Sequence, residues 1–317
     1  MEKRELGSSG IRVTPFCFGG NVFGWTADEK TSFQLLDTLT DMGFDFIDTA
    51  DVYSSWAPGN KGGESETIIG NWLKRTGKRD KVIIATKVGK PMGPDKKGLS
   101  KTYIQQAVEA SLKRLQTDHI DLYQSHDDDK TTPLAETMEA FTQLIKQGKV
   151  RTIGASNYAG ARLKEALEIS RKNGLASYQT LQPEYNLYSR EGYETDLEAV
   201  CLENNIGVIT YYSLARGFLS GKYRSEADLS KSQRGSGIRQ FLNERGMRIL
   251  DALDKVAKEY NSTPAAISLA WLIKRPGIVA PIASATSIGQ LKDITGAVDI
   301  NLSDEAIQQL NMASAYK

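Results

Sequence analysis

The hydrophobic positions of this chain follow two alternating periods. Short runs rich in β-branched and aromatic residues are separated by longer stretches in which apolar residues recur every three or four positions. The short runs predict buried strands, and the longer stretches predict amphipathic helices that each cover a strand. The expected strands are 16–18, 44–47, 82–85, 120–123, 152–154, 178–181, 208–210 and 279–282. The expected helices are 31–42, 65–74, 102–115, 134–146, 161–172, 197–204, 243–260, 264–274 and 304–313.

Eight strand signals with helices between them favour a closed (β/α)8 TIM barrel. A doubly wound open sheet is the main alternative, because periodicity alone does not establish closure. Residues 4–6 and 11–13 flank a Ser-Ser-Gly turn and predict an N-terminal β-hairpin ahead of the barrel. Residues 216–239 are polar and lack a clear period, which predicts a long loop on the active face. No composition break marks a linker, so we expect a single barrel domain over 1–317 with extra C-terminal helices.

Composition narrows the function mainly by exclusion. The 317 residues are 40% hydrophobic with a formal net charge of +1, so the chain can bury a large core and lacks the positive excess of a nucleic-acid binder. No stretch approaches an apolar membrane span, and the start has no apolar core of signal-peptide length. The two cysteines, Cys17 and Cys201, form neither a metal-type nor a redox pair. A reducing, cytoplasmic setting is the default expectation.

Polar and ionisable side chains gather where the predicted strands end. In an unrelated sequence, such residues would be scattered over both ends of the strands. Because the carboxyl ends of barrel strands meet at one mouth, we expect these side chains to converge although they lie far apart in the sequence. The residues at or just after strand ends are Asp48, Tyr53, Lys87, His126, Ser156, Asn157, Gln182 and Tyr211.

The first four of these residues are suited to donating a proton to a carbonyl oxygen. When a hydride reduces a carbonyl, negative charge develops on the oxygen and a proton donor must meet it. The Tyr53 phenol has an ordinary pKa near 10, which a neighbouring Lys87 ammonium would lower, with the Asp48 carboxylate on the far side holding that ammonium. His126 would hydrogen-bond the carbonyl or help relay the proton. Singly, each residue has a plainer explanation as a turn cap, a packing ring or a solvated side chain.

The motifs around these residues resemble those of the aldo-keto reductase family. In chain order they are Phe-Ile-Asp-Thr-Ala-Asp-Val-Tyr, Ala-Thr-Lys-Val, Asp-Leu-Tyr-Gln-Ser-His, Gly-Ala-Ser-Asn, Leu-Gln-Pro-Glu-Tyr-Asn and Leu-Ala-Arg-Gly-Phe-Leu-Ser-Gly-Lys-Tyr. The resemblance runs from near the start of the chain to near its end. The motifs are similar to those of the bacterial and potassium-channel-β-subunit-like branches of the family. It implies a catalytic tetrad of Asp48, Tyr53, Lys87 and His126, with Tyr53 as the general acid and no metal.

The resemblance also implies a nicotinamide cofactor, with NADPH as the family default and NAD possible. Ser284 and Thr286 offer only hydroxyls where the family often places a basic partner for the adenosine 2′-phosphate, so the preference for NADP over NAD stays open. The chain has no Gly-x-Gly-x-x-Gly, which removes the chief marker of a Rossmann fold. The residues that the resemblance assigns to cofactor binding are Gly20, Asn21, Asp48, Ser156, Asn157, Gln182, Tyr211, Leu214, Arg216, Gly217, Lys222, Ser284, Thr286, Gln290 and Asp293.

Two other functions stay open at this point. One is a cofactor-sensing or regulatory subunit that keeps the tetrad but turns over slowly, and the other is a barrel isomerase or lyase that uses Lys87 as a Schiff-base amine. A charged, paired ammonium is a poor nucleophile, which favours the reductase. We expect a small-molecule carbonyl substrate in a pocket shaped by Trp25, Trp56 and the loop 216–239. The acidic run 127–129 after the histidine predicts that anionic substrates are disfavoured, and the sequence assigns no oligomeric state.

Overall fold

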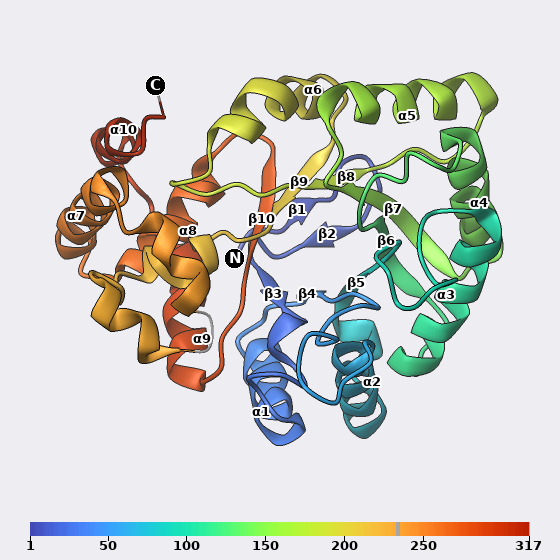
Figure 1. Cartoon of the computed structure of the whole chain (residues 1–317), viewed down its shortest axis with the longest axis horizontal. Coiled ribbons are helices and arrows are strands. Elements are labelled where there is room, and N and C mark those ends of the chain that lie inside the picture. The colour runs from blue at the N-terminus through green and yellow to red at the C-terminus, as the bar shows by residue number, and fades with distance from the viewer. Residues whose placement is uncertain (233–234, 317) are drawn as a thin grey trace.

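Eight parallel strands close into a barrel ringed by helices in the computed structural model, which describes residues 1–232 and 235–316 (Figure 1). Around the barrel the strand order is β10-β3-β4-β5-β6-β7-β8-β9. Closure confirms the predicted (β/α)8 fold and excludes the open sheet. Residues 233, 234 and 317, which the predicted loop and domain include, lie outside the described residues. The strands are β3 (Cys17–Gly19), β4 (Phe46–Asp48), β5 (Ile83–Val88), β6 (Ile120–Ser125), β7 (Val150–Ser156), β8 (Thr180–Gln182), β9 (Gly207–Thr210) and β10 (Ile278–Ala283).

The helices cover the outer face of the barrel because each buries one apolar side. In α1, for example, Leu35, Leu36 and Leu39 are buried at the three-to-four spacing that the sequence shows. None of the helices in the described part of the chain is long and apolar enough to cross a membrane. Their bounds are α1 (Glu29–Asp41), α2 (Glu64–Thr76), α3 (Lys101–Leu115), α4 (Leu134–Lys146), α5 (Gly160–Asn173), α6 (Glu198–Glu203), α7 (Glu244–Glu259), α8 (Pro264–Lys274), α9 (Ile288–Thr295) and α10 (Asp304–Ala313).

Helix caps explain several boundaries. Thr263 accepts a hydrogen bond from the Ala266 N–H at the start of α8, and Ser303 does the same for Ala306 in α10.

Helix α9 has no counterpart among the predicted elements. It spans eight residues, and its buried apolar side chains are Leu291 and Ile294, so its periodic signal is too short to register.

The predicted long loop folds into three tight helical segments, η4 (Ala215–Ser220), η5 (Glu226–Lys231) and η6 (Gly235–Phe241). Arg216 and Gly217 adopt left-handed backbone conformations, with φ of 59° and 102°, and interrupt the first segment. Because a 3₁₀-helix has three residues per turn and occurs in short pieces, these segments leave no 3.6-residue period in the sequence.

An N-terminal hairpin closes the end of the barrel where the strands begin. Strands β1 (Arg4–Glu5) and β2 (Arg12–Val13) pair antiparallel, as predicted. Their neighbours Leu6 and Ile11 are buried against apolar side chains from the barrel interior. The Arg4 guanidinium donates to the carbonyl of Ile278, at the start of β10. With one end plugged in this way, the hollow of the molecule lies at the other end, where the strands finish.

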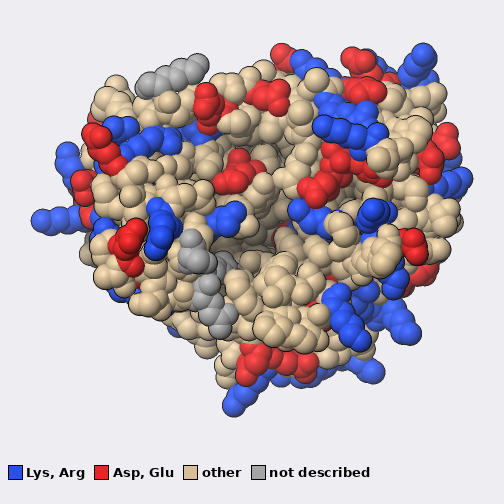
Figure 2. Space-filling model, viewed as in Figure 1, with Lys and Arg blue, Asp and Glu red and all other residues tan. Residues whose placement is uncertain are grey.

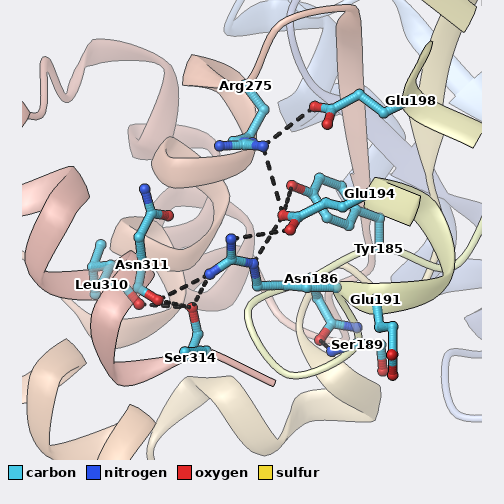
Figure 3. Close-up of polar contacts among 12 residues, drawn as sticks. Tyr185, Asn186, Ser189, Glu191, Glu194, Glu198, Arg275, Leu310, Asn311 and Ser314 are labelled. Atoms are coloured by element: carbon cyan, nitrogen blue, oxygen red, sulfur yellow. Dashed lines mark hydrogen bonds and ion pairs between the residues drawn. The ribbon is translucent and has the colours of Figure 1, made fainter. Parts of the chain in front are cut away.

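A clamp of polar contacts fastens the C-terminal helix to the barrel, and its residues Glu194, Asn311 and Ser314 are labelled in Figure 3. Arg190 donates to both carboxylate oxygens of Glu194, at 2.8 and 3.0 Å. The same guanidinium donates to the Asn311 carbonyl at 3.0 Å and to the Ser314 hydroxyl at 2.8 Å, at the end of α10. The side chains of Arg190 and Glu194 are only 11% and 10% exposed. We call these four residues the C-terminal clamp. A cation at the carbonyl end of a helix also complements the helix dipole.

Candidate active site

A hollow of about 700 Å³ opens at the end of the barrel where the strands finish. Figure 2 shows the hollow near the centre of this face, with acidic and basic side chains around it. The sequence prediction that strand ends converge is therefore met by the structure. The predicted residues that line the hollow are Asn21, Trp25, Asp48, Tyr53, Trp56, His126, Ser156, Asn157, Gln182, Tyr211, Leu214, Arg216, Gly217 and Ser284.

Asp48, Lys87 and Tyr53 form a closed triangle of hydrogen bonds at the foot of the hollow. The fully buried Lys87 Nζ donates to Asp48 Oδ2 at 2.7 Å and to Tyr53 Oη at 2.9 Å. It also donates to the Thr49 carbonyl at 2.8 Å, so all three ammonium donors are used. The Tyr53 hydroxyl lies 3.2 Å from the same Asp48 oxygen. The carboxylate thus contacts both partners instead of lying on the far side of the ammonium, as the sequence analysis expected.

The pKa of the phenol also differs from that expectation. Burial raises the pKa of Tyr53 well above its ordinary value, and the Asp48 carboxylate raises it further. Burial lowers the pKa of Lys87, although Asp48 acts in the opposite direction. Tyr53 therefore keeps its proton at neutral pH and is a neutral donor. An alkoxide is basic enough to take a proton from such a phenol, so the raised pKa is compatible with general-acid chemistry.

His126 follows β6 directly and lies beside the phenol. Its ring centroid is 6.0 Å from that of Tyr53, and the side chain is buried. Among the described residues, its Nδ1 atom has no hydrogen-bond partner. Burial, followed by the charges of Lys87 and Lys90, lowers the pKa of His126 well below its ordinary value. The imidazole is therefore neutral at physiological pH and can present an N–H to a ligand oxygen without carrying a charge.

Gln124 supports Asp48 and was missed by the sequence analysis. Asp48 Oδ1 accepts a hydrogen bond from Gln182 Nε2 at 2.9 Å and a longer one from Gln124 Nε2 at 3.4 Å. Gln124 is fully buried on β6, two positions before His126. Side chains two positions apart on a strand point the same way, so a buried amide at this spacing was the available signal. Both oxygens of the Asp48 carboxylate are thus held in place.

The residues that end or follow β7, β8 and β9 add amide groups and an aromatic ring to the hollow. Asn157 adopts a left-handed backbone conformation with φ of 58°, and its Nδ2 donates to the His126 carbonyl at 2.9 Å. Its Oδ1 accepts from the Tyr211 hydroxyl at 2.9 Å, and Ser156 Oγ donates to the Gln182 carbonyl at 2.8 Å. Asn157 does not cap α5, whose N-cap is Ala159. This combination of amides, hydroxyl and ring fits a planar ligand that carries a carboxamide, as the nicotinamide ring does.

Five residues that the resemblance assigns to cofactor binding lie outside the lining of the hollow. Two of them contact each other, since Gln290 Oε1 accepts from the Thr286 N–H at 2.9 Å at the start of α9. Asp293 accepts from the Thr263 hydroxyl at 2.7 Å. Their assignments stay predictions. The five are Gly20, Lys222, Thr286, Gln290 and Asp293.

The acidic run after His126 does not present three charges to the hollow. Asp127 lines it, and its carboxylate pairs with Lys90 at 3.1 Å. Asp128 is largely buried in an ion pair with Arg162 at 3.0 Å. Asp129 accepts hydrogen bonds from the backbone N–H groups of Leu99 and Thr131. It also accepts from the hydroxyls of Thr131 and Thr132 in its own loop. The expectation about anionic substrates was drawn from three carboxylates, whereas only one, already paired, lines the hollow.

Comparison with known proteins confirms the motif resemblance over nearly the whole chain. Residues 15–315 match the model of the family described as "Aldo/keto reductase family". The chain is 38% identical to an uncharacterised oxidoreductase of Bacillus subtilis, YrpG, over 98% of this chain and 95% of the relative. It is 32% identical to a probable voltage-gated potassium channel subunit beta of Arabidopsis thaliana, over 95% and 92% of the two chains. It is 29% identical to the aldo-keto reductase yakc [NADP(+)] of Schizosaccharomyces pombe, over 98% and 90%.

Proposed function

The chain belongs to the aldo/keto reductase family, and from this premise we propose that it reduces aldehydes and ketones to alcohols with NADPH. The observation that carries the proposal is the buried triangle of Asp48, Lys87 and Tyr53, with contacts of 2.7, 2.9 and 3.2 Å. A protonated phenol held in this way at the foot of a cavity is suited to donate a proton to an oxygen that gains charge.

Each residue of the tetrad has a distinct part in the proposed reaction. Tyr53 donates its proton to the substrate oxygen as negative charge develops there. The Lys87 ammonium, hydrogen-bonded to Tyr53 Oη, stabilises the phenolate that remains, and Asp48 balances the charge of Lys87. The neutral imidazole of His126 orients the carbonyl oxygen. NADPH supplies the hydride when it is bound.

The residues that end or follow β7, β8 and β9 would hold that cofactor. Ser156, Asn157 and Gln182 offer the hydroxyl and amide groups for the carboxamide, and Tyr211 offers a ring face beside them. Arg216, with Leu214 and Gly217, would lie along the pyrophosphate. A relative whose name includes NADP(+) supports NADPH, while the uncharged Ser284 and Thr286 favour acceptance of NADH as well.

A panel of aldehydes and ketones, assayed with NADPH and NADH beside Tyr53→Phe, tests the proposed function. We expect the unmodified protein to reduce several compounds of the panel. In Tyr53→Phe, turnover should fall by about a hundredfold or more, the usual contribution of a general acid, while NADPH affinity from fluorescence titration stays within about twofold. Wild-type rates in Tyr53→Phe would refute the acid role.

A second candidate function is a cofactor-sensing subunit that turns over slowly. The similarity to a probable potassium channel subunit beta over 95% of the chain favours it. In that case the protein would bind NADPH tightly but reduce no compound of the panel in repeated turnovers.

The small-molecule substrate and a cytoplasmic setting are proposals too. The two buried, unpaired cysteines support a reducing compartment.

A further inference from the structure

The part of the hollow nearest the tetrad has an aromatic wall and a charged wall. The aromatic wall comes from the loops after β3 and β4, where the rings of Trp25 and Trp56 meet edge to face at 5.7 Å. The Trp56 side chain is 48% exposed, so its apolar ring is available to an apolar ligand. The charged wall comes from the loops after β5 and β6, which contribute Lys90 and Asp127.

Lys90 and Asp127 form an ion pair in which an anionic ligand can replace Asp127 as the partner of Lys90. The Lys90 ammonium lies 3.1 Å from Asp127 Oδ2, and the two side chains are 36% and 45% exposed. The other Asp127 oxygen accepts from Asn157 Nδ2 at 2.8 Å, so the carboxylate stays supported if the lysine leaves. An ammonium has three donors, and within residues 1–232 and 235–316 only Asp127 engages that of Lys90.

The charged wall starts beside the point where a substrate carbonyl would bind. Lys90 is ion-paired to Asp127, the residue that follows His126 in the chain, and all three residues line the hollow. His126 in turn neighbours Tyr53, the proposed proton donor. A substrate whose ring packs against Trp56 and whose carbonyl oxygen lies at Tyr53 therefore shares one cavity with Lys90.

We propose that Lys90 is a specificity-determining residue that binds a carboxylate on an aromatic aldehyde or ketone, and that Asp127 holds Lys90 when no such substrate is bound. The inference rests on the proposed function, because it takes Tyr53 as the site of the carbonyl oxygen. A half-exposed ion pair contributes little. A charge-assisted bond inside a cavity from which the substrate displaces water is stronger. Carboxylate-bearing substrates are thus favoured, which reverses the expectation drawn from the acidic run 127–129.

The test compares kcat/KM for 4-carboxybenzaldehyde and benzaldehyde, both with NADPH, and uses the ratio of the two values. In Lys90→Met we expect this ratio to fall about tenfold, because the carboxylate loses its partner. In Asp127→Asn we expect it to rise, because Lys90 is released from its competitor. Lys130→Met is the matched control, since Lys130 is an exposed lysine outside the lining of the hollow, and its ratio should not change.

A ratio that is unchanged in Lys90→Met, or that falls in Asp127→Asn, would overturn the inference. If the unmodified protein reduces neither aldehyde, the subsite is tested by binding alone, and the proposed function fails only when no compound of the carbonyl panel is reduced. Tryptophan fluorescence then follows a titration with 4-carboxybenzyl alcohol in the presence of NADP⁺, since Trp25 and Trp56 line the hollow. About tenfold weaker binding to Lys90→Met supports the subsite, and equal binding refutes it.

Discussion

The Lys87 ammonium donates to the Tyr53 hydroxyl across 2.9 Å, and the Asp48 carboxylate contacts both groups. Lys87 is fully buried and uses its third donor on the Thr49 carbonyl, so its position is fixed by three acceptors on one segment of chain, residues 48–53. The proton donor and the cation that stabilises its phenolate are therefore held by a single short segment and one strand end.

Lys87→Met removes this cation, and we expect a fall in turnover of about a hundredfold or more, with NADPH affinity little changed. The variant also leaves the buried Asp48 carboxylate without its ion-pair partner, which destabilises a protein by about 3–5 kcal/mol. Stopped-flow or steady-state absorbance of NADPH measures the first effect, and urea denaturation measures the second. The double variant Asp48→Asn/Lys87→Met is the control for folding, because it should regain much of the stability but none of the turnover. Recovery of turnover in the double variant would contradict the role of Lys87.

The pH dependence of kcat should be flat through neutrality and fall on the alkaline side. The lowered pKa of His126 keeps the imidazole neutral, so no acid limb is expected near its ordinary pKa of about 6.5. The raised pKa of Tyr53 keeps the phenol protonated, whereas the lowered pKa of Lys87 makes the ammonium the first group to lose its proton as the pH rises. A pH–rate series at saturating substrate and cofactor checks this. An acid limb near pH 6.5 that disappears in His126→Gln would show that the imidazole titrates near its ordinary pKa and is inactive when protonated, which would contradict the lowered pKa.

The sequence predicted the barrel and the convergence of the tetrad because both follow from local pattern. Strand and helix periods are local, and the carboxyl ends of barrel strands always meet. It did not predict that Asp48 bonds to both Tyr53 and Lys87, nor the support from Gln124, because these depend on how neighbouring strands are aligned. The same reason explains why the sequence does not show which carboxylates of the acidic run reach the hollow. Only the folded loop decides that Asp128 pairs with Arg162 and is not part of the lining.

Arg190→Met should destabilise the protein by about 1.5–3 kcal/mol, because it removes the charge-assisted hydrogen bonds to the buried Glu194 carboxylate, which keeps Arg275 at 3.6 Å and the Tyr185 hydroxyl at 2.8 Å. It also removes the donors that hold the Asn311 carbonyl and the Ser314 hydroxyl in the C-terminal clamp. Lys149→Met is the matched control, since its ion pair with Glu109 is 34% and 57% exposed and should contribute less than about 1 kcal/mol. Urea denaturation measures both variants, and equal losses would show that the clamp contributes no more than a surface pair.

Asp51→Asn should stabilise the protein at alkaline pH. Asp51 is 2% exposed, and neither of its carboxylate oxygens has a hydrogen-bond partner among the described residues. Burial, and then the charge of Glu66, raises the pKa of Asp51 to about 8, against the opposing charge of Arg114. The folded protein therefore binds one more proton than the unfolded chain between the ordinary pKa of an aspartate, about 4, and pH 8, so the free energy of unfolding falls as the pH rises through this range.

The asparagine variant lacks this ionisation, and its gain in stability over the wild type should grow from near zero at pH 4–5 to several kcal/mol at pH 8, since each unit of pKa difference corresponds to about 1.4 kcal/mol. Urea denaturation at pH 5, 6.5 and 8 measures the trend. Asp251→Asn, an exposed aspartate on α7, is the control and should change the free energy of unfolding by less than about 0.5 kcal/mol at every pH. A difference between Asp51→Asn and the wild type that does not vary with pH would show that the Asp51 carboxyl is ionised in the folded protein throughout this range.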